Sequence, residues 1–240
     1  ILYFRRTGRE GIQNNRTRNL GEINTNDDFV ISGNLENYSV MNIGGLLDTN
    51  NLLNTGSLKA VDKIYTSGVS FNNSGEILTT LLDINSTGIL NTNKITVIDN
   101  AKLNGSNVTN NGYISGTNIE IITAGLTNTG TLAADELIKV NNTTINNTGY
   151  IGSNQRIILN GSNMSNQGSM ESNIIELYNL SGYNNIGGSI KGTGVYITTL
   201  GNIDLRGTLH GENDLRINAY EIWHNDIITG KGYIELKGHD

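Results

Sequence analysis

One tripeptide, Asn-x-Gly, returns along most of this chain at nearly constant spacing. Its glycines, called marks below, lie 19, 37, 18, 19, 19 and 19 residues apart, and Asn93 stands at the midpoint of the gap of 37. A longer step before Gly207 indicates a one-residue insertion at Gly188. An internal repeat of about nineteen residues is typical of a solenoid. The ten marks are Gly56, Gly75, Asn93, Gly112, Gly130, Gly149, Gly168, Gly187, Gly207 and Asp226.

Apolar side chains follow the same register. Two residues after each mark stands an aliphatic residue such as Leu58, Ile77 or Ile95, and seven to ten residues after it comes an alternating pair such as Ile138/Val140 or Ile157/Leu159. A third apolar position follows near residue fifteen: Phe71, Val108, Ile145, Met164, Tyr183 and Ile222. Alternation with period two is typical of strands rather than helices.

These columns predict an all-β fold, a right-handed parallel β-helix of about ten coils of roughly 19 residues. Parallel strands need a connection of a dozen or more residues, which one coil supplies, and such crossovers are right-handed in nearly all cases. A leucine-rich repeat is excluded because Asp135 and Asn154 stand where it needs leucine, three residues before Ile138 and Ile157. Residues 41–240 are assigned to this solenoid. Residues 1–40, with Arg5, Arg6, Arg9, Arg16 and Arg18, are set apart as a cap, a junction or a tail.

Asparagine stands two residues before eight successive marks, which predicts a structural ladder. In a parallel stack each side chain lies about 4.8 Å from its copy in the next coil, so amide donors and acceptors can bond along the column. The eight residues are Asn54, Asn73, Asn91, Asn110, Asn128, Asn147, Asn166 and Asn185. At the marks themselves we expect backbone with positive φ, which glycine and asparagine tolerate best.

The composition of the chain argues against nucleic-acid binding and against a membrane span. The net charge is −6 without a basic stripe in the repeat, so nucleic acid is not an expected partner. No apolar run approaches eighteen residues, so no membrane span is expected. The chain has no cysteine and begins at Ile1 without a recognisable signal peptide, and we read it as part of a longer protein.

Two segments, NTGTLAADELIKV at residues 128–140 and GYIGSNQRIILNG at residues 149–161, resemble the repeats of filamentous-haemagglutinin-like exoproteins. That family includes the contact-dependent growth-inhibition exoproteins, and the likeness extends over about residues 50–240. The resemblance implies a secreted rod on the bacterial cell surface, exported through an outer-membrane transporter (two-partner secretion). It further implies adhesion to a receptor or glycan of a host or neighbouring cell, or presentation of a distal domain. It implies no enzyme activity.

No catalytic residue, cofactor site or metal site is predicted. His210, His224 and His239 lack companion ligands at metal-site spacing, and His224 falls in the asparagine column. The alternative function is a pectate-lyase-like, glycan-cleaving β-helix. Its only candidate residues are four carboxylates near the C-terminal coils: Asp204, Glu212, Asp214 and Glu221.

Two surface features complete the expectations. Tyr220, Trp223 and Tyr233 form the only aromatic concentration and are a candidate contact patch, since exposed aromatic side chains mark interaction surfaces. The outward residue between each alternating pair gives a line of alternating charge, Asp83, Lys102, Glu120 and Lys139, continued at Arg216 and Glu235. Opposite charges on neighbouring parallel strands attract, so we expect one solvent-facing line.

Overall fold

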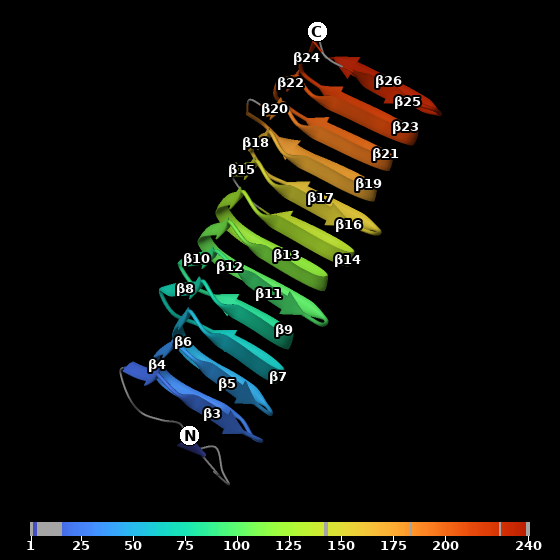
Figure 1. The fold of residues 1–240 in the computed structure, drawn as a ribbon. Coiled ribbons are helices and arrows are strands. Elements are labelled where there is room, and N and C mark those ends of the chain that lie inside the picture. Colours follow the sequence, from blue (N-terminus) through green and yellow to red (C-terminus); the bar gives the residue numbers. More distant parts are fainter. Residues whose placement is uncertain (1, 4–15, 142–143, 183, 226, 239–240) are drawn as a thin grey trace. The chain divides into compact units, whose positions relative to one another are not determined.

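The computed structural model describes residues 2–3, 16–141, 144–182, 184–225 and 227–238. These residues form strands and no helix, arranged as a parallel β-solenoid of about 11 turns of roughly 19 residues. The chain divides into two compact units, residues 1–117 and 118–240, and each is described by itself. Figure 1 shows strands from successive turns stacked side by side within each unit. The solenoid predicted from the repeat is confirmed.

The first unit contains twelve described strands and the beginning of a thirteenth. They are β1 (Leu2–Tyr3), β2 (Arg16–Asn19), β3 (Glu22–Thr25), β4 (Phe29–Asn37), β5 (Val40–Ile43), β6 (Leu46–Asn54), β7 (Ser57–Thr66), β8 (Ser70–Asn73), β9 (Glu76–Asn85), β10 (Gly88–Asn91), β11 (Lys94–Val97), β12 (Asn100–Asn110) and β13 (Tyr113–Asn128).

The second unit takes over within β13 and continues through the remaining described strands. They are β14 (Thr131–Asn141), β15 (Thr144–Asn147), β16 (Tyr150–Ser153), β17 (Arg156–Asn160), β18 (Asn163–Asn166), β19 (Ser169–Leu180), β20 (Asn184–Ile186), β21 (Ser189–Thr199), β22 (Ile203–Leu205), β23 (Thr208–Ala219), β24 (Ile222–His224), β25 (Ile228–Gly230) and β26 (Tyr233–Gly238).

The apolar columns stack as the register predicts. In the first unit Ile77 pairs with Leu58 on one side and Ile95 on the other. In the second unit Ile157 lies between Ile138 and Ile175. All of these side chains are buried. Burying a side chain of this size contributes about 1.5–3 kcal/mol relative to leaving it exposed, so the columns are the main source of stability.

The insertion in the second unit lies earlier in the chain than predicted. Ile186, not Asn185, pairs with Asn166, and Gly188 rather than Gly187 packs over Gly168. The placing of Asn185 in the ladder and of Gly187 among the marks is therefore wrong by one residue. The long step of 20 residues falls between Gly168 and Gly188. The predicted mark Asp226 and the predicted column residue Tyr183 lie outside the described residues.

Because of that insertion, Asn184 occupies a position of the third apolar column. It pairs there with Met164 and with Ile203. The side chain is fully buried, and its Oδ1 accepts a hydrogen bond of 3.0 Å from the Met164 N–H. Its Nδ2 donates to the Gly182 carbonyl at 2.8 Å. Because a buried amide is tolerated when its polar atoms are bonded, the column admits this asparagine.

Part of the N-terminal segment that the sequence sets apart lies in the stack. Strand β2 pairs in parallel with β4, β3 pairs with β5, and β4 pairs with β6. Strand pairing therefore crosses residue 40 without a break, and the repeat includes residues 16–40. Arg16 and Arg18 are not a separate basic run, because both bond Glu36 on the next turn. Arg5, Arg6 and Arg9 lie outside the described residues.

The asparagine ladder forms in both units and is longer than predicted in the first. Each Nδ2 donates to the Oδ1 of the next turn at 2.7–2.8 Å, from Asn19 through Asn37, Asn54, Asn73 and Asn91 to Asn110, and again from Asn128 through Asn147 to Asn166. The Nδ2 groups also donate to backbone carbonyls, as Asn73 does to Gly75 at 3.0 Å and to Lys94 at 3.2 Å. The amides are buried, so the ladder saturates polar groups that have no access to water.

We predict that Asn73→Ala destabilises the chain far more than Asn72→Ala. Asn73 is fully buried between Asn54 and Asn91, whereas the neighbouring Asn72 points away from the interior. Removing Asn73 leaves a buried donor of Asn54 and a buried acceptor of Asn91 short of a partner, and each such loss costs about 1–3 kcal/mol. Urea unfolding of both variants measures the difference. Equal midpoints would mean that the ladder does not stabilise the fold.

Close approach of the backbone favours glycine at the marks, and the expectation of positive φ is wrong for these glycines. Neither Gly75 nor Gly149 lies in the left-handed region. A Cβ at Gly75 would lie 2.0 Å from the Gly56 carbonyl oxygen, and a Cβ at Gly149 would lie 2.0 Å from the Gly130 oxygen. The turn of one coil therefore rests directly on the turn of the coil before it.

Asn93 shows what a side chain at a mark requires. The hydrogen bond that follows it, from the Lys94 N–H to the Gly75 oxygen, is 3.4 Å long. The equivalent bond from Glu76 to Gly56 is 2.9 Å, and that from Tyr113 to Asn93 is 2.7 Å. The hydrogen bond to the preceding coil is therefore longer where the mark carries a Cβ.

We predict that Gly75→Ala lowers stability while Gly88→Ala does not. The alanine Cβ at position 75 meets backbone atoms that cannot rotate away, whereas the nearest atom to a Cβ at Gly88 is 3.9 Å away. The expected cost at position 75 is about 1–3 kcal/mol, in the range of overpacking. Thermal midpoints of the two single variants provide the comparison. A loss at position 88 that matched the loss at position 75 would contradict the packing argument.

Glu36 is the most strongly perturbed carboxyl among the described residues. The hydrogen bond from Arg16, with further bonds from Arg18 and Tyr38, lowers the pKa of Glu36 to about 2, although burial acts in the opposite direction. The Arg18 Nε lies 2.7 Å from Oε2, and the Tyr38 hydroxyl lies 3.1 Å from the same oxygen. Since the folded pKa is below its ordinary value, ionised Glu36 stabilises the fold above that value and this contribution is lost as the pH falls toward 2.

We therefore predict that Glu36→Gln lowers stability at pH 7 and that the difference from the unchanged chain disappears as the pH falls from about 4.5 toward 2. Urea midpoints at several pH values test this. In the background Arg16→Gln/Arg18→Gln the effect of Glu36→Gln should be small at every pH. A difference that persisted at pH 2 would show that the ion pairs are not its cause.

Candidate functional site

The outward side chains of β21, β23 and β26 form a grid on the surface of the second unit. Alternation in these strands buries Ile197 and Ile217 and turns their neighbours toward solvent. Tyr196 pairs with Arg216, and Arg216 with Glu235. The next outward line holds Thr198, Asn218 and Lys237 in the same register.

Arg216 is the centre of this grid. Its Nε donates to Oδ1 of Asp214 at 3.0 Å, and its Nη2 lies 3.0 Å from Oδ2, a two-point contact that fixes the guanidinium plane. The guanidinium carbon lies 6.0 Å from the ring centre of Tyr196 and 5.3 Å from that of Tyr233, within the range of cation–π attraction. Asp214 also accepts a hydrogen bond of 3.2 Å from the Tyr196 hydroxyl.

The charges of the grid are paired at neutral pH. Asp214 raises the pKa of the Arg216 guanidinium, mainly through their hydrogen bond. The hydrogen bond from Lys237, whose Nζ lies 2.6 Å from Oε1, lowers the pKa of Glu235. Burial raises the pKa of the Tyr196 hydroxyl, and the bond to Asp214 acts in the same direction. The site therefore presents two cations, two anions and a neutral tyrosine.

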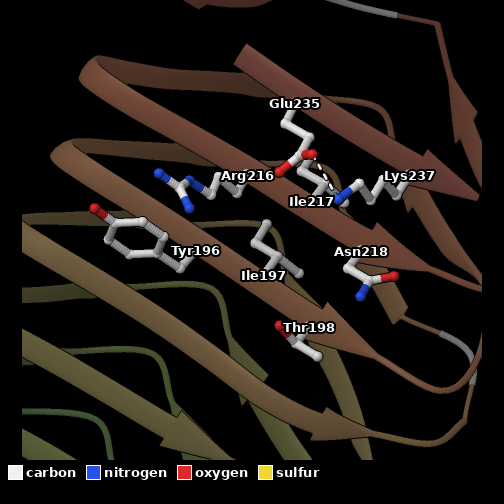
Figure 2. A pocket seen from close by; sticks show the side chains of 8 residues that line it. All are labelled: Tyr196, Ile197, Thr198, Arg216, Ile217, Asn218, Glu235 and Lys237. Atoms are coloured by element: carbon white, nitrogen blue, oxygen red, sulfur yellow. Dashed lines mark ion pairs between the residues drawn. The ribbon is translucent and has the colours of Figure 1, made fainter. Parts of the chain in front are cut away.

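A hollow of about 200 Å³ lies within the grid. Figure 2 shows Tyr196 and Arg216 on one side of it, Thr198 and Asn218 on the other, and the Glu235–Lys237 ion pair at its end. Thr198 and Asn218 have short side chains, whereas Arg216 and Lys237 are long. The hollow arises because short side chains on two neighbouring strands are bordered by long ones.

The three residues of the predicted aromatic patch lie on different elements of the second unit, and their role as a contact patch stays a prediction. Tyr220, Trp223 and Tyr233 are 51 %, 48 % and 55 % exposed. Tyr233 begins β26 and borders Arg216, while Trp223 lies in β24, on the line of strands with β20 and β22. Tyr220 lies in the bend between β23 and β24. Trp223 pairs with Asp204, as the register predicts.

The four carboxylates considered for glycan cleavage each have a separate polar partner. Asp204 bonds Arg206 at 2.7 Å, Glu212 bonds Lys231 at 3.0 Å, Asp214 bonds Arg216, and Glu221 accepts from Asn202 at 3.1 Å. They lie on β22, on β23 and just before β24. Glu212 and Glu221 join neighbouring turns, whereas Asp204 and Asp214 each bond an arginine two residues along the chain.

Two of the three histidines lie among the described residues. His210 Nδ1 lies 2.7 Å from the Thr229 hydroxyl on the next turn. His224 pairs with Leu205 and continues the ladder column, as predicted. His239 lies outside the described residues. Within the part of the chain that the structure describes, no three His, Cys, Asp or Glu side chains are grouped as a metal site.

The charged line is in register within each unit. Asp83 pairs with Lys102 in the first unit, and Lys139 bonds Glu120 at 3.6 Å in the second. None of these four side chains is buried. Asp83 additionally bonds Lys63 diagonally across the strands at 2.8 Å. The step from Lys102 to Glu120 joins residues of different units and stays a prediction.

Sequence reasoning found one of the two lines of the grid. It identified the first outward line with Arg216 and Glu235, and the neighbouring Asp214 and Tyr233, but not the second outward line of Thr198, Asn218 and Lys237. The available signal was their position, two residues after Tyr196, Arg216 and Glu235 on the same strand face. The spacing does not predict the hollow, because the hollow depends on side-chain length and on the two-point contact of Arg216 with Asp214.

Comparison of the chain with family models, curated proteins and solved structures finds no match. The described residues contain no helix that is long and apolar enough to cross a membrane.

Proposed function

We propose that this chain is a structural segment of a secreted bacterial surface protein, an adhesin or exoprotein of the two-partner secretion type. In this role it spaces or presents other parts of the protein and contacts a receptor or glycan on a host or neighbouring cell. An outer-membrane transporter would export it. The observation that carries the proposal is the bonding between turns, where buried asparagines, backbone and most ion pairs join one coil to the next.

This bonding supports a structural role because it is repeated and local. Each turn is stabilised mainly by its neighbours, so the fold can be extended by adding turns without a new core. The ion pairs Arg156–Glu176 and Lys191–Glu171 each join adjacent turns on the surface. The absence of cysteine is compatible with passage through the periplasm without disulfide formation.

Glycan hydrolysis, one form of the competing function, uses a carboxyl that keeps its proton near neutral pH and acts as general acid. Glu235 in the hollow has a lowered pKa, and Asp214 is held by the two-point contact with Arg216. Both features favour recognition over hydrolysis. The proposal is therefore that this surface binds and does not cleave.

We predict that antibodies against the chain label intact cells of the organism that encodes it. Protease treatment of intact cells should remove the signal, and an antibody against a cytoplasmic protein should give none without permeabilisation. A chain found only in the cytoplasmic fraction would contradict surface display.

We also predict that the purified chain releases no product from a panel of plant, bacterial and animal polysaccharides. Reducing-end assays and mass spectrometry measure the release. Cleavage that disappeared in Asp214→Asn or Glu235→Gln would overturn the structural role and support the enzyme.

A further inference from the structure

The hollow on β21, β23 and β26 has the chemistry of a small polar binding site. Its volume of about 200 Å³ is below the roughly 300–1,000 Å³ of pockets for drug-sized ligands, so it suits one ring or a chain end. Its walls offer both hydrogen-bond donors and acceptors, from Thr198, Asn218, Glu235 and Lys237. A ligand that meets all of them must itself carry donors and acceptors close together.

The charge pairing argues against an anionic ligand. Arg216 already holds Asp214 through two contacts, and Lys237 holds Glu235 at 2.6 Å. An anion would have to compete with these carboxylates for both cations. The local sum of charge is zero, so nothing steers a sulfate, phosphate or uronic acid to this surface.

The position in the sheet disfavours a peptide inside the hollow. Strands β21 and β23 are each bonded on both sides, so a strand could be added only along β26, whose described partner is β23. The floor residues Ile197 and Ile217 are buried, so the hollow offers no apolar pocket for a hydrophobic anchor. A peptide that entered the hollow itself would lack both an open strand edge and an apolar pocket.

One wall is aromatic. The Tyr196 ring is partly exposed at the border of the hollow, with its hydroxyl fixed by Asp214 and its face near the Arg216 guanidinium. An aromatic ring next to hydrogen-bonding groups matches a sugar, whose C–H groups contact the part of the ring that Arg216 leaves exposed while its hydroxyls bond the polar side chains.

We propose that this hollow binds one ring of a neutral sugar, such as the terminal residue of an uncharged glycan. Tyr196 packs against the ring, and Thr198, Asn218 and the Glu235–Lys237 pair bond its hydroxyls. The inference deepens the adhesion part of the proposed function and rests on it for its biological setting. Sugar binding is measured on the isolated chain, so the result of that measurement can be interpreted even if antibodies do not label the cell surface.

The test uses the full 240-residue chain with methyl glycosides of glucose, galactose, mannose and N-acetylglucosamine at millimolar concentration. Saturation-transfer NMR detects contact, and calorimetric titration gives the Kd. At least one neutral probe should bind, with an affinity that is the same in 50 mM and 500 mM NaCl because no charge is exchanged. Binding of only sialylated or sulfated probes, binding of peptides alone, or no binding at all would overturn the proposal.

Variants locate the site. Tyr196→Ala and Asn218→Ala should each weaken binding by at least about ten-fold, the loss expected for about 1.4 kcal/mol of contact. Tyr113→Ala is the matched control, because Tyr113 is a 39 % exposed tyrosine on the first unit and should leave the Kd unchanged. If Tyr196→Ala does not fold, Thr198→Val tests the site instead. Thr198 is exposed, and this substitution replaces its hydroxyl by a methyl group of similar size. Unchanged affinity in the folded variants would contradict the assignment.

Discussion

The amide hydrogen bond between stacked asparagines is the interaction on which the arrangement of the coils up to Asn166 depends. Each Nδ2 bonds the Oδ1 of the next turn and also backbone carbonyls near the same turn, so one side chain fixes both the corner of its own coil and the distance to its neighbour. An apolar residue at this position could fill the space but could not bond those carbonyls. The ladder thus specifies the position of the turn, while the apolar columns supply most of the burial.

The mark glycines meet a second constraint at the same corner. The turn after each ladder asparagine approaches the preceding coil so closely that a Cβ at Gly75 or Gly149 would lie 2.0 Å from a carbonyl oxygen. Asn-x-Gly is therefore one device with two parts: the asparagine closes the corner, and the glycine permits the approach. Where the ladder ends at Asn166, Ile186 and Leu205 take over the column, yet Gly188 and Gly207 still pack on the turn before them.

The periodicity of the sequence predicted the fold, the columns and the ladder because these depend on residue type at fixed spacing. It failed where a coil changes length. Asn185 stands 19 residues after Asn166, so the spacing assigns it to the ladder. The structure instead gives the ladder position to Ile186 and buries Asn184 beside Met164. The N-terminal coils were missed although Asn19-Leu20-Gly21 carries the motif, because Asn37 is followed by Ser39 instead of glycine and the step from Asn37 to Asn54 is only 17 residues.

The hollow was beyond prediction for a different reason. Inward positions are restricted by stacking, so their residue types repeat, whereas outward positions are free to vary and carry no period. Leu177 pairs with Ile197, but the outward residue after Leu177 is the long Tyr178 and the one after Ile197 is the short Thr198. The register between these two strands also shifts after this pair, so local backbone and side-chain length together decide whether the surface is filled or hollowed. A solenoid of this kind can therefore acquire a binding site by outward substitutions on two or three neighbouring turns, at little cost to the inward columns that stabilise it.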